Sequence, residues 1–92
     1  MQARALRWRT VSAEALAWHD FEGEIAVRNA RTGSTHLLDR DAAEVLRALM
    51  EAQAALSVRE IAERLDADEW ATQIQEVLTQ LQRLELVEAA SP

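Results

Sequence analysis

Cysteine is absent from this sequence of 92 residues. The chain can therefore form neither a disulfide framework nor a thiolate metal site. The sequence has only two glycines and one proline, the residues that most often break helices, and 49% of its residues are hydrophobic. This composition argues against disorder and for a compact, helix-rich domain. No apolar run approaches the roughly 18 residues of a membrane span, and the N-terminal arginines precede no secretory signal. We expect a single cytoplasmic domain over residues 1–92, without a membrane partner.

Lysine is absent as well, so every basic residue is arginine, and the net charge is −6. Residues 1–50 balance seven arginines against seven acidic residues, whereas residues 51–92 hold three arginines against nine acidic residues. An acidic half of this kind repels phosphate backbones. The charge distribution therefore argues against a nucleic-acid partner.

The first half of the chain alternates between apolar and polar side chains with a period of two residues, which predicts strands. The predicted strands lie near residues 5–9, 15–21, 24–29 and 34–38. Gly23 is expected in a tight turn, and Gly33 in a hairpin loop where a positive φ is needed. The last three strands therefore predict an N-terminal three-stranded antiparallel β-sheet, with residues 1–14 as an extra strand or arm.

After Leu38 the apolar period changes to three and four residues, which predicts three helices and a short final strand. These elements are expected near residues 40–51, from Ser57 to Leu65, near 69–84 and near 86–89. Asp39 and Asp68 are expected to cap helices, and Ser57 with Glu60 forms a capping box. The last two helices and the strand read as a winged helix-turn-helix. The predicted fold class is α+β: a three-stranded sheet followed by a three-helix winged helix-turn-helix.

Catalytic and metal-binding patterns are weak in this sequence. His19 and His36 are predicted on different strands, and no third fixed ligand accompanies them. No Ser or Thr lies beside a recognisable base, and there is no glycine-rich phosphate loop. We therefore expect no catalytic residue, no cofactor and no metal ion, so the chain is not expected to be an enzyme.

Binding is the remaining class of function, and three partners fit the predicted elements. The strand at 34–38 forms a sheet edge whose open N–H and C=O groups can pair with a foreign peptide strand. The same edge can instead join a second copy as a homodimer. A helix-turn-helix also suggests a DNA-binding transcriptional regulator with its second helix in the major groove. The carboxylates around that helix oppose the DNA alternative, which nevertheless stays open.

The order and spacing of three motifs resemble a known family. The motifs are "GEIAVRNARTGSTHLLDRDAAEVLRAL", "LSVREIAERL" and "VLTQLQRLELV". They look like the PqqD-like family of RiPP recognition elements, which are chaperones of ribosomally made, post-translationally modified peptides. The "TGSTHLL" version is similar to the branch found beside kinases related to HPr kinase. The resemblance covers about residues 15–90 and implies a non-catalytic adaptor. Such an adaptor captures the leader of a precursor peptide by β-strand addition and presents it to a modifying enzyme, here an HPr-kinase-related or a radical enzyme.

The resemblance also implies where the peptide binds, namely beside the third strand and in a groove walled by the last helix. Carried over by position, the peptide-binding residues are Ser34, Thr35, His36, Leu37 and Leu38 on the edge and Trp70, Ala71, Ile74, Gln75 and Leu78 on the wall. Ile74 and Leu78 also lie in the middle of an apolar stripe, where core packing explains them. Trp70 lies in the first helical turn, where we expect it to be partly exposed and to anchor a partner.

The sequence departs from the family pattern in two places. Glu85 stands where the founding members have a glycine before the final apolar pair. Asn29 and Ala30 stand where a Tyr-Pro pair is typical of the turn between strands. These departures place the chain in a divergent branch of the pattern and leave the identity of its peptide open.

Overall fold

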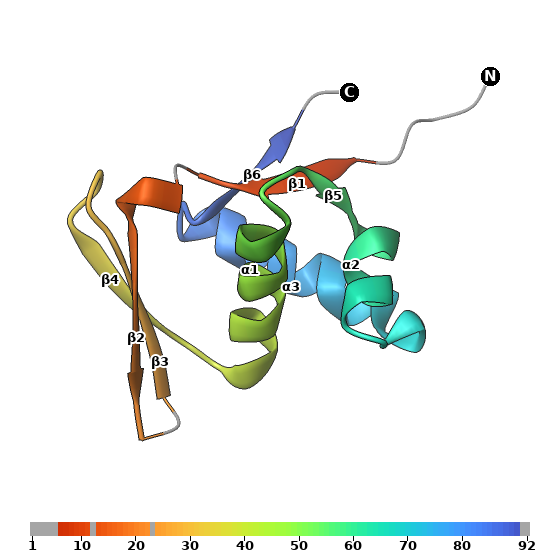
Figure 1. Ribbon diagram of the computed structural model, residues 1–92, viewed down its shortest axis with the longest axis horizontal. Helices are drawn as coiled ribbons and strands as arrows, with labels where there is room; N and C mark the ends of the chain where they lie inside the picture. The colour runs from red at the N-terminus through yellow and green to blue at the C-terminus, as the bar shows by residue number, and fades with distance from the viewer. Residues whose placement is uncertain (1–5, 12, 23, 91–92) are drawn as a thin grey trace.

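The computed structural model describes residues 6–11, 13–22 and 24–90, which form an α+β fold with two antiparallel sheets and three α-helices (Figure 1). The elements are β1 (Arg7–Thr10), β2 (Leu16–Phe21), β3 (Glu24–Asn29), β4 (Ser34–Leu38), α1 (Arg40–Ala52), β5 (Leu56–Ser57), α2 (Val58–Arg64), α3 (Ala71–Arg83) and β6 (Val87–Ala90), with 3₁₀ turns at Ala13–Ala15 and Asp68–Trp70. The predicted fold class, a three-stranded antiparallel sheet followed by three helices, is confirmed. The turn expected at Gly23 lies outside the described residues.

The first sheet has the order β2-β3-β4, with both of its hairpins antiparallel. Val27 in the middle of β3 pairs with Trp18 of β2 and with His36 of β4. The carbonyl of Asn29 accepts hydrogen bonds from the N–H groups of Thr32 at 3.2 Å and Gly33 at 2.8 Å, which closes the second hairpin. Gly33 has a φ of +75°, so the predicted positive φ is confirmed.

The second sheet has the order β5-β1-β6 and joins the two ends of the chain. The strand expected near residues 86–89 is β6, and all four residues of β1 pair with it. Trp8 of β1 is 3% exposed, as part of the core. Arg7 and Arg9 point outward and form ion pairs of 2.7 Å with Glu60 and Glu88. The strand expected near residues 5–9 therefore belongs to the C-terminal sheet and closes it against the helices.

Two of the three expected helix caps form. The Asp39 carboxylate accepts the N–H of Ala42 at 2.9 Å, and both bonds of the Ser57–Glu60 capping box are present. The expectation that Asp68 caps the last helix is wrong, because Asp68 lies inside a 3₁₀ turn and α3 begins only at Ala71. A backbone bond of 2.9 Å from the N–H of Trp70 to the carbonyl of Ala67 forms this turn in place of a side-chain cap.

Helix α1 lies at the centre of the fold and packs against α2, α3, β1, β3 and β4 (Figure 1). Its buried face meets the apolar faces of the other helices. The largest fully buried aliphatic side chains are Val27, Leu46, Leu49, Ile61, Leu78, Leu81, Leu86 and Val87. No helix among the described residues is long and apolar enough to cross a membrane. One core therefore holds both sheets against α1 and α3, and this arrangement positions the candidate site.

Candidate functional site

The open edge of β4 is the first component of the candidate site. Within the described residues, β4 pairs with β3 on one side and with no strand on the other. Leu38 is buried, and Ser34 and His36 on the same face are half-buried. Thr35 and Leu37 point to the other face, where Leu37 is 70% exposed. The N–H of Ser34 donates to the Thr32 hydroxyl at 3.2 Å. The rest of this edge pairs with no further strand of the described residues and carries no charged side chain that would oppose one.

The proposed wall on α3 divides into two faces, because successive helical residues are rotated by about 100°. Trp70 lies in the 3₁₀ turn just before α3 and not, as expected, in the first turn of the helix. Trp70 and Ile74 line a cavity between α1 and α3. Ala71 and Gln75 face α2 and line a different cavity. Leu78 is fully buried between these faces. The structure therefore brings Trp70 and Ile74 together and separates them from Ala71 and Gln75, while Leu78 lies one helical turn after Ile74 on the same buried stripe.

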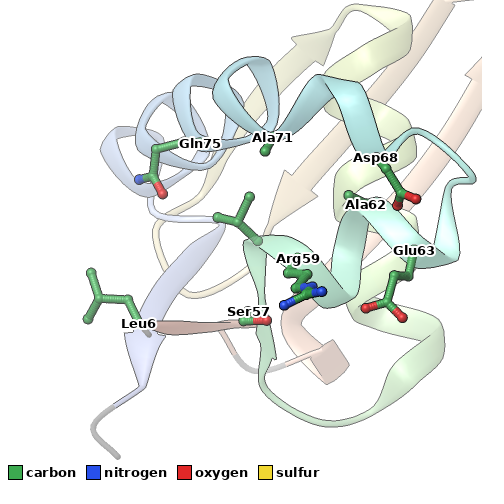
Figure 2. Close-up of a pocket in the computed structure, with 9 residues that line it drawn as sticks. Leu6, Ser57, Arg59, Ala62, Glu63, Asp68, Ala71 and Gln75 are labelled. Carbon is green, nitrogen blue, oxygen red and sulfur yellow. The ribbon is translucent and has the colours of Figure 1, made fainter. Parts of the chain in front are cut away.

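The cavity between α2 and α3, which we call the α2–α3 cavity, has a volume of about 880 Å³ (Figure 2). In Figure 2, Ala71 and Gln75 project from α3, while Arg59, Ala62 and Glu63 line the side of α2. Leu6, just before β1, also lines this cavity and is 55% exposed. Basic and acidic side chains are mixed around this cavity, so its rim has no strong charge preference.

The cavity between α1 and α3, which we call the α1–α3 cavity, is smaller, at about 250 Å³. Its apolar wall comes from Val45 of α1, from Leu65 after α2, and from Ile74 and Val77 of α3. Trp70 borders it and is 43% exposed, which confirms the expected partial exposure of this side chain. Four carboxylates complete the lining, from Asp41, Glu44, Asp66 and Glu69.

The α1–α3 cavity begins close to the end of β4 along the chain. Asp41, in the first turn of α1, follows the last residue of β4 by three positions. Helix α1 packs against both β4 and α3, so it connects the open edge to the cavity. The sequence set Asp66 and Glu69 only against DNA binding and did not group the four carboxylates, because each has an ordinary place at a helix end or on a solvent-facing side. Their convergence depends on how α1 packs against α3.

His19 and His36 do not form a metal site. His19 pairs with Ala26 of β3 and His36 with Val27, and successive residues of a strand point to opposite faces. The two imidazoles therefore lie on opposite faces of the sheet. Among the described residues, no three His, Cys, Asp or Glu side chains are placed so that they could hold a metal ion.

The clearest electrostatic perturbation belongs to a helix cap. The pKa of Glu60 is lowered, first by the hydrogen bond from the N–H of Ser57 and also by the nearby Arg7 guanidinium. Oε1 of Glu60 accepts the Ser57 N–H at 2.9 Å and an Arg7 N–H at 2.7 Å. This carboxylate joins α2 to β1, which is a structural role.

Asn29 and Glu85, one residue from each of the two places where the sequence departs from the pattern it resembles, contact each other. Asn29 is 2% exposed, and its Nδ2 donates to the carbonyl of Glu85 at 3.1 Å. Its Oδ1 accepts the N–H of Arg31 at 2.9 Å. Glu85 has a φ of +63°, in the left-handed region that favours glycine. The turn before β4 is therefore fastened to the turn after α3, and sequence reasoning missed this link.

Comparison with known proteins shows a shared fold. No protein-family model and no curated protein sequence matches the chain. The solved structure of TbiB1 in complex with the TbiA(beta) leader peptide is similar, with a TM-score of 0.68 and 18% sequence identity. The match covers 91% of this chain and 99% of the TbiB1 chain. At this identity the likeness establishes the fold, and the site must be argued from the residues of this chain.

Proposed function

We propose that this chain is a non-catalytic adaptor for a ribosomally made precursor peptide. It binds the leader segment as an additional strand on the open edge of β4 and presents the peptide to a modifying enzyme. The observation that carries this proposal is the uncharged open edge of β4, connected through α1 to a cavity with an exposed tryptophan. The fold similarity to TbiB1, solved with a leader peptide, supports it.

Strand addition fits the chemistry of this edge. Main-chain hydrogen bonds along Ser34–Leu38 supply affinity that depends little on sequence, and pockets beside the edge supply selectivity. In the α1–α3 cavity, Trp70 offers a large exposed aromatic surface for a selective contact, and Ile74 lines the same cavity. The proposed site therefore combines the β4 edge with the α1-facing side of α3. Ala71 and Gln75 line the α2–α3 cavity, and the buried Leu78 supports α3 from within.

The modifying enzyme stays a prediction of the sequence resemblance, as an HPr-kinase-related or a radical enzyme. Self-association through the β4 edge into a homodimer also stays a prediction, and it competes with the peptide for the same groups. Light scattering across a concentration series distinguishes the two, because an edge-paired homodimer dissociates when the peptide is added.

Titration with peptides copied from short reading frames beside the gene tests the proposal. Amide chemical shifts and slowed hydrogen exchange are expected along Ser34–Leu38, together with a shift of the Trp70 indole N–H. Strand β2 provides the internal control, since it is the opposite edge of the same sheet. Unchanged β4 amides with every such peptide, or equal effects on β2 and β4, would contradict strand addition at β4.

A matched pair of variants separates the two faces of α3. Trp70→Ala is expected to weaken peptide binding about tenfold or more, the loss typical of an aromatic anchor. Gln75→Ala on the opposite face is expected to leave affinity unchanged, because Gln75 lines the α2–α3 cavity. The reverse result would place the peptide site in the α2–α3 cavity.

The alternative function, a DNA-binding regulator, is decided by a gel-retardation assay with local operator fragments at low salt.

A further inference from the structure

The lining of the α1–α3 cavity combines an apolar wall with a strongly acidic mouth. Val45, Ile74 and Val77 supply aliphatic surface at the wall. The carboxylates come from three separate parts of the chain: α1, the turn after α2, and the 3₁₀ turn before α3. No arginine from the described residues lines this cavity. Negative charge therefore gathers around one small apolar space.

Neighbouring arginines do little to neutralise this charge. Glu44 approaches Arg40 at 4.0 Å, but the Arg40 side chain is 91% exposed and such surface pairs are weak. Asp41, Asp66 and Glu69 take part in none of the ion pairs found among the described residues. The mouth of the cavity is thus complementary to a cation that arrives with a binding partner.

We propose that the α1–α3 cavity binds an arginine or lysine side chain of the leader peptide, so that a basic residue is the anchor of recognition. The proposal rests on the proposed function and assigns the chemistry of its selective pocket. Long basic side chains bury their aliphatic stems on apolar surface and keep the charged head in water. The aliphatic wall suits the stem, and the four carboxylates suit the head.

Trp70 adds a preference for arginine over lysine. Its side chain borders the cavity and is 43% exposed, so its indole is accessible to a bound side chain. A guanidinium stacks on an aromatic face and pairs with a carboxylate through its planar fork, which an ammonium does only as a point charge. Asp41 of the cavity follows the end of β4 by three residues, so we place the anchor in a peptide segment beyond the one that pairs with β4.

Two small probes test the cavity without any knowledge of the peptide sequence. N-acetyl-arginine amide is expected to shift the Trp70 indole N–H and the Asp66 amide. N-acetyl-citrulline amide has nearly the same shape without the charge and is expected to bind about tenfold more weakly. Equal binding of the two probes, or no shift at the cavity with the arginine probe, would overturn the proposal.

Two double variants with the same change in net charge complete the test. Asp41→Asn with Glu69→Gln removes two carboxylates from the α1–α3 cavity. Glu51→Gln with Asp68→Asn removes two that line other cavities. The first is expected to lose the preference for arginine over citrulline and the second to retain it. Equal losses would show a nonspecific effect of net charge and overturn the proposal.

The outcomes also separate this proposal from the proposed function. In one outcome, peptides pair with β4 and bind equally well after their basic residues are replaced by citrulline or glutamine. That result would support the adaptor function and contradict the proposal of a basic anchor. Conversely, an arginine probe that binds the cavity while no peptide shifts the β4 amides would support the cation preference and contradict leader binding at β4.

Discussion

The hydrogen bonds of Asn29 predict a large loss of stability on substitution of this one side chain. Asn29→Ala removes a donor to the Glu85 carbonyl and an acceptor for the Arg31 N–H, both at a 2% exposed site. Each bond contributes about 1 kcal/mol, and the two groups left without their partner at this part-buried site add to the loss. We expect the free energy of unfolding to fall by about 2 to 3 kcal/mol, a large share of the roughly 5–15 kcal/mol that stabilises a domain.

Asn29→Asp tests the same hydrogen bonds through the pH dependence of the free energy of unfolding. At neutral pH the introduced carboxylate faces the Glu85 carbonyl with no proton to donate, whereas the protonated acid is able to donate. Burial raises the pKa of this group above the value near 3.9 of an unfolded chain. A raised pKa means that the deficit relative to wild type is small in acid and grows as the pH rises through the folded pKa.

Urea unfolding followed by tryptophan fluorescence measures both variants. Thr32→Ala is the control, since its hydroxyl lies in the same turn but is exposed, and its loss is expected to stay below about 1 kcal/mol. If the free energy of unfolding of Asn29→Ala lies within about 0.5 kcal/mol of the wild-type value, the proposed contribution of the Asn29 hydrogen bonds is refuted. An Asn29→Asp deficit that does not change with pH would refute it as well.

Three further substitutions test other parts of the fold. Glu85→Gly removes the strain of a side chain held at a φ of +63° and is expected to stabilise the fold by about 0.5–1 kcal/mol. Tm should then rise by a few degrees, and a lower Tm would contradict this expectation. Ser57→Ala removes half of the capping box and is expected to destabilise by about 1 kcal/mol in thermal unfolding. The lowered pKa of Glu60 means that its contribution is complete above its ordinary value of 4.5 and is lost as the pH falls through the lowered pKa. Glu60→Gln should therefore lose less stability between neutral pH and acid than wild type does.

Local sequence patterns predicted the elements well where a short-range cause determines them. The alternation over residues 24–29 and 34–38 gave β3 and β4 with their observed bounds, because a half-buried sheet requires a period of two. The Ser57–Glu60 box marked the start of α2 for a similar reason. The start of α3 was predicted too early, since the 3₁₀ turn before Ala71 forms through backbone bonds that carry no side-chain signal.

The candidate site was harder to predict because it depends on tertiary packing. The β4 edge follows from strand order, and its five residues were named correctly as the last strand of the sheet. The wall was assigned to one stretch of α3, but a helix turns Ala71 and Gln75 away from Trp70 and Ile74. Which of these faces meets α1 depends on contacts between residues far apart in the sequence, and no local periodicity contains that information.

The two departures from the family pattern bear on how the β4 edge is held. A glycine at position 85 would take a positive φ without strain, and Glu85 takes it at some cost in free energy. The left-handed turn nevertheless directs the Glu85 carbonyl to Asn29, which fastens the start of β4 to the end of α3. At its other end β4 continues into α1, which packs on α3. Strand β4 and helix α3 are thus connected at both ends, so a peptide strand added to β4 meets preformed surfaces and loses little affinity to their ordering. Asn29→Ala should therefore weaken peptide binding as well as stability, although Asn29 lies outside the proposed contact surface.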